Sequence, residues 1–109
     1  MSIDFDRFLD WAEKRWHGDV VVKGKEILVN SIFQEDFRHN LACDPTGGKH
    51  KRPNGVYRCF YTDKKGTLPG LVMLVDNCSW EEALEILGGE DIELAELHKK
   101  IELLFVLDI

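Results

Sequence analysis

Apolar residues near the start of the chain recur at the spacing of an amphipathic helix. Asp4 can cap the N-terminus of such a helix, and the pattern continues to about Trp16 before His17-Gly18 ends it. Polar residues lie mostly on the opposite side. The apolar stripe consists of Phe5, Phe8, Leu9, Ala12 and Trp16.

Short β-branched and aromatic runs separated by turn residues follow this helix and predict strands. The first two runs form a hairpin around a tight turn at Lys23-Gly24-Lys25. Residues 44–55 are dense in Gly, Pro, Asn and Asp, which predicts a long surface loop. The predicted strands cover residues 20–22, 27–29, 39–43 and 56–61.

Helix signals dominate the rest of the chain. Pro69 suits only the first turn of a helix, which we expect to begin at residue 67 or 68 and to end near Asp76. Ser79 and Glu82 form a capping box that opens the next helix. A last helix over residues 91–107 carries an apolar stripe, which would pack on the domain's own sheet or dock a partner or downstream domain.

These elements predict one α+β domain spanning residues 1–109. It has a small antiparallel sheet of three to five strands, flanked by an N-terminal helix and three C-terminal helices. Apolar residues make up 44% of the chain and charged residues 31%, which is ordinary for a soluble protein. No apolar run approaches the ~18 residues of a membrane span, and no signal peptide opens the chain. We therefore expect a cytoplasmic protein with no membrane partner.

Charge is distributed unevenly along the chain, although the net charge is −6. Residues 38–65 carry seven Lys or Arg and two Asp or Glu, whereas residues 80–109 carry two and nine. A basic middle followed by an acidic tail is more informative than the total. The simplest alternative is two solvated faces of opposite sign.

Catalytic and metal-binding patterns are weak. The sequence has no nucleophile elbow, phosphate-binding loop or His-Glu-x-x-His pattern, so we do not expect an enzyme. Three irregularly spaced cysteines argue against a disulfide framework. The potential zinc ligands contain no Cys-x-x-Cys or Cys-x-x-His pair, so zinc is not expected as a cofactor. They are His39, Cys43, His50 and Cys59.

One segment resembles the second half of a zinc ribbon from a phage or bacterial-type DNA primase. It consists of Tyr57-Arg58-Cys59-Phe60 through Gly66, an apolar helix and the capped helix after Ser79. Ser31-Ile32-Phe33-Gln34 stands where the family has Cys-Pro-Phe-His. On this placement Cys59 is the one zinc ligand kept. Serine, glutamine and threonine, none of them a good zinc ligand, occupy the other positions, which are Ser31, Gln34 and Thr62.

The resemblance covers about residues 20–87 and implies a degenerate zinc-ribbon-like sheet without zinc. It also implies a non-catalytic module that holds single-stranded template DNA for a primase catalytic domain, a helicase or another replication protein. Cations and exposed aromatic rings suit such a platform, and Tyr57 and Tyr61 are expected to share a strand face with Cys59. The alternative is that both tyrosines are core. The candidate DNA-binding residues are Arg38, Lys49, Lys51, Arg52, Tyr57, Arg58, Tyr61, Lys64 and Lys65.

A second class of function is a protein–protein interaction module. The lost zinc ligands, the net negative charge and the apolar C-terminal helix suit a domain that docks on a replication protein. The same features suit a small phage-type inhibitor that mimics nucleic acid with acidic side chains and blocks host nucleic-acid machinery.

Overall fold

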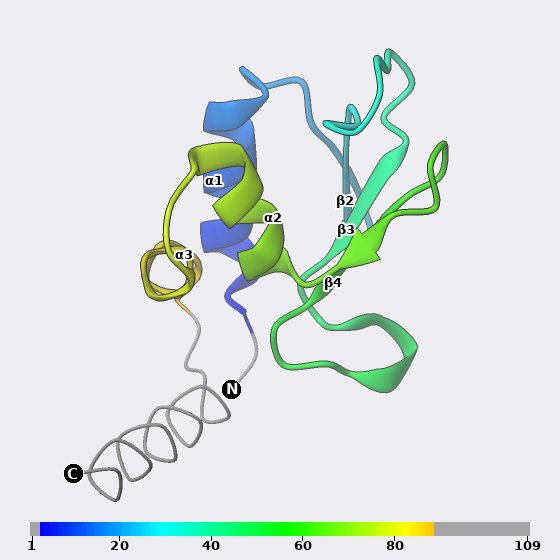
Figure 1. Cartoon of the computed structure of the whole chain (residues 1–109). Helices are drawn as coiled ribbons and strands as arrows, with labels where there is room; N and C mark the ends of the chain where they lie inside the picture. Colours follow the sequence, from blue (N-terminus) through cyan, green and yellow to red (C-terminus); the bar gives the residue numbers. More distant parts are fainter. Residues whose placement is uncertain (1–2, 89–109) are drawn as a thin grey trace, which may run out of the picture.

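The chain folds into a five-stranded antiparallel sheet with helices on one side of it (Figure 1). This computed structural model describes residues 3–88. Each strand pairs with the next one in sequence, so the spatial order is the chain order. The α+β class and the antiparallel sheet are as predicted. The strands are β1 (Val21–Lys23), β2 (Glu26–Val29), β3 (Leu41–Asp44), β4 (Val56–Cys59) and β5 (Lys65–Gly66).

The N-terminal helix α1 spans Phe5–Arg15, close to its predicted bounds. The Asp4 carboxylate accepts a hydrogen bond from the backbone N–H of Arg7 at 3.0 Å, which caps the helix as expected. The predicted apolar stripe omitted Trp11, which is 4% exposed. Trp11 is buried because its indole N–H finds a partner across the helix interface, the carboxylate of Asp76 at 3.0 Å.

Both described C-terminal helices begin where the sequence predicts, the second of them at the predicted cap Ser79. The hydroxyl of Thr67 accepts from a backbone N–H of the first helix, and the hydroxyl of Ser79 accepts from the N–H of Glu82 at 3.1 Å in the second. Gly88, with φ of +71°, ends the second helix. The predicted third helix, over residues 91–107, lies outside the described residues. The two helices are α2 (Leu68–Asp76) and α3 (Trp80–Leu87).

Alternation along the strands divides the sheet into two faces. One face, called the inner face below, packs against the helices and forms the core. Its opposite, the outer face, includes Leu28, Ala42 and Arg58, and no helix among residues 3–88 covers it (Figure 1). The buried inner-face residues are Ile27, Val29, Leu41, Cys43, Tyr57 and Cys59.

The predicted surface loop at residues 44–55 is only partly superficial. Pro45 is fully buried, and a short 3-10 helix interrupts the loop at Gly48–His50. The loop is anchored because the backbone N–H of Leu68 donates to the carbonyl of Asn54 at 3.1 Å. A second bond, from the N–H of Ile3 to the loop, ties it to the N-terminus. None of the described helices is long and apolar enough to cross a bilayer.

Candidate nucleic-acid interface

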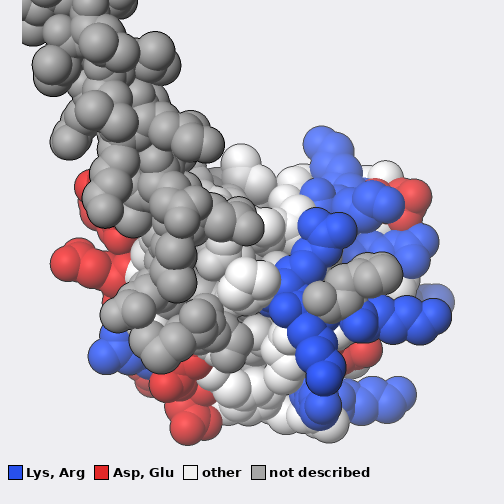
Figure 2. Space-filling model, turned by 90° about the horizontal axis from the view of Figure 1, so that it is seen from below, with Lys and Arg blue, Asp and Glu red and all other residues white. Residues whose placement is uncertain are grey.

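Positive and negative side chains gather on different sides of the molecule. Seen from below, Lys and Arg are concentrated on the side of the sheet, whereas the helical side carries more Asp and Glu (Figure 2). Among the described residues, positive charge is thus concentrated on one side of the surface seen in this view. A concentrated positive surface attracts polyanions, and this attraction weakens as the salt concentration rises.

Two cations face each other directly on the outer face. Arg58 of β4 and Lys65 of β5 are partners in the strand register, so both side chains project from the same side. Like charges at such a position destabilise a sheet unless an anion lies between them. Both residues are exposed, and Lys65 forms no ion pair within the part of the chain that the structure describes. Arg58 and Lys65 therefore place two positive charges side by side on the exposed face of the sheet.

Asp63 forms an ion pair with part of the guanidinium group of Arg58. Nε of Arg58 donates to Oδ1 of Asp63 at 3.0 Å, and Nη2 lies 2.8 Å from the same oxygen. Both side chains are well exposed, at 61% and 70%, so this ion pair contributes little to stability. Nη1 of this guanidinium has no hydrogen-bond or ion-pair partner among residues 3–88 and is free to bind a ligand oxygen.

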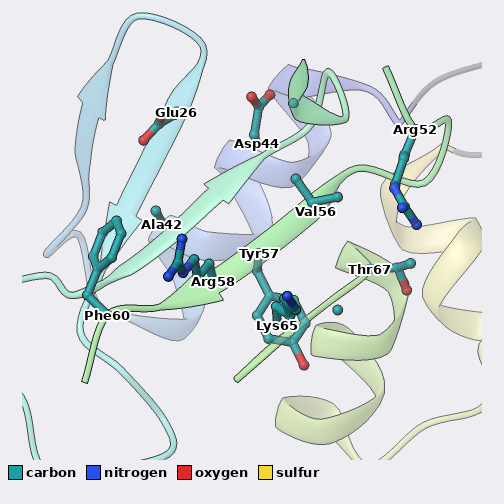
Figure 3. Close-up of a pocket in the computed structure, with 12 residues that line it drawn as sticks. Glu26, Ala42, Asp44, Arg52, Val56, Tyr57, Arg58, Phe60, Lys65 and Thr67 are labelled. Atoms are coloured by element: carbon teal, nitrogen blue, oxygen red, sulfur yellow. The ribbon is translucent and has the colours of Figure 1, made fainter. Parts of the chain in front are cut away.

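A depression of about 660 Å³ lies over this part of the outer face (Figure 3). Phe60 stands at one end of it and Arg52 at the other, and Ala42 contributes a small apolar surface between them. The depression therefore combines three cations, two carboxylates, an aromatic ring and an apolar floor. Its charged lining residues are Glu26, Asp44, Arg52, Arg58 and Lys65.

The β2–β3 and β4–β5 connections lie at the same end of the sheet and contact each other at the thiol of Cys59. The Sγ atom of Cys59, at the end of β4, lies 3.0 Å from the Oγ atom of Ser31, in the connection between β2 and β3. Burial of the thiol raises the pKa of Cys59, but hydrogen bonds from Ser31, from the side chain and backbone of Thr62 and from the backbone of Tyr61 outweigh it. The net result is a pKa below the ordinary cysteine value.

Three of the four positions that the resemblance aligns with zinc ligands are thus close together. They offer one thiol and two hydroxyls, a donor set that does not fit structural zinc. The fourth position, Gln34, is exposed. Among residues 3–88, no three His, Cys, Asp or Glu side chains group in a way that would hold a metal.

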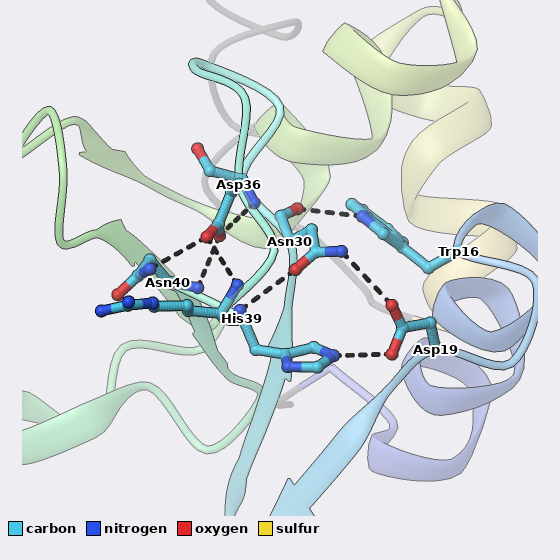
Figure 4. A network of polar contacts seen from close by, with 8 residues as sticks. Trp16, Asp19, Asn30, Asp36, His39 and Asn40 are labelled. Atoms are coloured by element: carbon cyan, nitrogen blue, oxygen red, sulfur yellow. Dashed lines mark hydrogen bonds and ion pairs between the residues drawn. The ribbon is translucent and has the colours of Figure 1, made fainter.

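A buried carboxylate organises the turn that contains Ser31 (Figure 4). Asp36 is 7% exposed and accepts hydrogen bonds from the backbone N–H groups of Ser31, Arg38 and Asn40 at 2.7–2.9 Å. It also accepts from the side-chain amide of Asn40 at 2.9 Å. Burial raises the pKa of Asp36, but these four hydrogen bonds lower it far below its usual range. The carboxylate therefore stays charged and holds the turn together.

A second set of polar contacts ties this turn to the end of α1 (Figure 4). The indole N–H of Trp16 donates to the carbonyl of Asn30 at 2.9 Å, and the amide of Asn30 donates to Asp19 at 3.3 Å. The backbone N–H of His39 donates to the Asn30 side chain, and its ring lies 2.7 Å from Asp19. These side-chain and backbone hydrogen bonds fix the turn against the end of α1.

The prediction that Tyr57 and Tyr61 share a face is wrong. Strand β4 ends at Cys59, because the N–H of Asp63 donates to its carbonyl and its N–H donates to the carbonyl of Lys64, closing a turn. Tyr57 is 8% exposed on the inner face and stacks on Phe33 at 5.9 Å, whereas Tyr61 is 47% exposed in the turn. Tyr57 therefore belongs to the core and offers no base platform.

The other predicted residues do not form one group. Arg52, Arg58 and Lys65 line the depression. Lys64 lies over the ring of Phe33 at 5.1 Å, and Lys51 lines a different depression beside the start of α1. Arg38 and Lys49 are exposed, on the β2–β3 turn and the β3–β4 loop respectively.

Phe60, 59% exposed, is an aromatic lining residue that sequence reasoning missed. Phe60 follows Arg58 by two residues on the predicted strand, so strand alternation places both side chains on one face and could have identified Phe60.

No family model, curated protein or solved structure matches the chain, so the assignment of this site rests on its geometry.

Proposed function

We propose that the chain is a non-catalytic, cytoplasmic DNA-binding module of a phage or mobile-element primase-type replication protein. The module holds single-stranded template DNA for a separate catalytic domain, and the outer face of its sheet contacts the DNA. The observation that carries this proposal is the like-charged pair Arg58 and Lys65 on an uncovered face. Arg52 adds a third cation at the edge of the same depression. Successive phosphates are the polyanion that suits such a row.

The arrangement of the two turns supports the kinship with primase zinc ribbons. The β2–β3 and β4–β5 connections leave the sheet at the same end and meet through Ser31 and Cys59. Thr62 also bonds to the thiol. These are the positions that the resemblance aligns with metal ligands. In this chain, hydrogen bonds to Asp36 hold the β2–β3 turn in place of metal bonds.

The test is a fluorescence-anisotropy titration of the full chain with an oligothymidylate of about 16 nucleotides. Affinity is measured between about 50 and 200 mM salt for wild type and for the double variant Arg58→Gln/Lys65→Gln. The matched control is Lys14→Gln/Lys25→Gln, which removes the same charge from exposed positions that do not line the depression.

We expect wild type to bind more weakly as salt rises. Each lost phosphate contact lowers the slope of log K against log salt by about 0.7 for a single strand, so the Arg58/Lys65 variant should lose about 1.4. The control should keep the wild-type slope. No binding at low salt, or equal slopes for the two double variants, would overturn the proposal, and the former would favour a protein-docking module.

A further inference from the structure

The floor of the depression has room above it because one central residue is small. Ala42 of β3 lies between Leu28 of β2 and Arg58 of β4 in a single cross-strand row on the outer face. A side chain of one carbon leaves the space over the middle of this row open. The row is continued by Lys65, so apolar floor and positive charge adjoin.

Phe60 forms a wall beside this floor on a well-fixed backbone (Figure 3). Its backbone N–H donates to the carbonyl of Asn40 at 2.8 Å, which holds the start of the turn against β3. The guanidinium carbon of Arg58 lies 6.0 Å from the centre of its ring. The ring is 59% exposed, so a ligand in the depression can reach it.

We propose that the depression holds one unstacked base of a bound single strand. The base lies over Ala42 against the ring of Phe60, and the adjoining phosphate binds Arg58 and Lys65. Because every base has an aromatic face, this contact adds affinity without selecting a sequence. The inference rests on the proposed function and makes Phe60 a base-contacting residue of that same site.

The experiment separates bases from phosphates by comparing two ligands of equal charge. One is the oligothymidylate, and the other is an oligonucleotide of the same length in which every sugar is abasic. Both are titrated at one salt concentration against wild type and Phe60→Ala. The matched control is Phe37→Ala, which removes a ring that is even more exposed, at 78%, but does not line the depression.

Wild type should bind the oligothymidylate roughly 10-fold more tightly than the abasic strand, the order expected for stacking of one base. Phe60→Ala should lose most of this ratio and keep its affinity for the abasic strand, whereas Phe37→Ala should keep the ratio. Ala42→Leu, which fills the floor but leaves the ring, should also lose the ratio. That second variant covers the case in which Phe60→Ala does not fold.

The outcomes distinguish failure of this inference from failure of the proposed function on which it rests. If the abasic strand binds as tightly as the oligothymidylate, or if Phe60→Ala and Ala42→Leu keep the wild-type ratio, the inference is overturned while phosphate binding stands. If wild type binds neither strand at low salt, the proposed function and the inference both fall.

Discussion

The thiol of Cys59 and the hydroxyl of Ser31 lie 3.0 Å apart and join the two turns at one end of the sheet. The two residues are separated by 28 positions in sequence, so their contact depends on the whole β2–β4 arrangement. A thiol with hydrogen-bonding neighbours and a lowered pKa is a usable metal ligand, but hydroxyls are poor partners for zinc.

Restoring the missing ligand types should therefore create a zinc site. We expect Ser31→Cys/Gln34→His/Thr62→Cys to bind one zinc ion, because three thiolates and an imidazole form an ordinary structural donor set. Zinc content is measured by elemental analysis, and thermal melting should become sensitive to a strong chelator. Wild-type melting should be insensitive to it.

Adding Cys59→Ser to the triple variant serves as the control and should abolish the zinc. A folded triple variant that contains no zinc after refolding with the metal would contradict the relationship between these four positions and the ligands of a primase zinc ribbon.

Asp36 should make the protein sensitive to acid. Its folded pKa lies below its unfolded value, so its stabilising effect is present above about pH 4 and is lost as pH falls below that value. Asp36→Asn should lower the free energy of unfolding by roughly 2–3 kcal/mol at pH 7, since charge-assisted bonds to a buried carboxylate are lost. Urea unfolding at pH 7 and pH 3 measures both effects.

The variant should also show a flatter dependence of stability on pH. Glu35→Gln is the matched control, because it removes a neighbouring charge that is exposed, and it should behave as wild type. If Asp36→Asn and wild type lose equal stability between pH 7 and pH 3, the hydrogen bonds to Asp36 are not what holds the turn.

Asp63→Asn should strengthen binding to single-stranded DNA. The change weakens the hold on Nε and Nη2 of Arg58 and removes a negative charge beside the depression. Asp63 has φ of +57°, a left-handed conformation that asparagine also adopts readily, so the turn should be kept. Affinity should rise by roughly 3-fold, within the small free energy of an exposed ion pair.

The matched control for this prediction is Asp10→Asn, which releases Lys14 from an exposed ion pair on α1. Anisotropy titrations at one salt concentration compare the two variants. Equal changes in affinity would show that overall charge, and not the freed Arg58, is responsible.

Local signals predicted much of the fold. The caps at Asp4 and Ser79, the helix start near Pro69 and the turn around Gly24 depend on residues only a few positions apart, so they can be predicted from the local sequence. The end of β4 could not be predicted in the same way. It depends on hydrogen bonds that close the turn between Cys59 and residues 63 and 64, where an alternating pattern still suggests strand.

The candidate site shows the same division. Arg58 and Lys65 were predicted as DNA-binding residues from their charge. Their position opposite each other follows from the register of β4 and β5, which the sequence does not show. Tyr57 shares a face with Cys59, as alternation predicts, but that face is the buried one, where Tyr57 stacks on Phe33. Lys51 was grouped with Arg52 by sequence proximity, although the chain turns between them and they line different depressions.

The most direct measurement of the central claim is an NMR titration of the isotopically labelled full chain with a short oligothymidylate. Binding on the outer face predicts amide shift changes concentrated at Ala42, Arg58, Phe60 and Lys65, with α1 and α3 unchanged and the changes reversed by added salt. Shift changes confined to the helices, or none at low salt, would contradict the account.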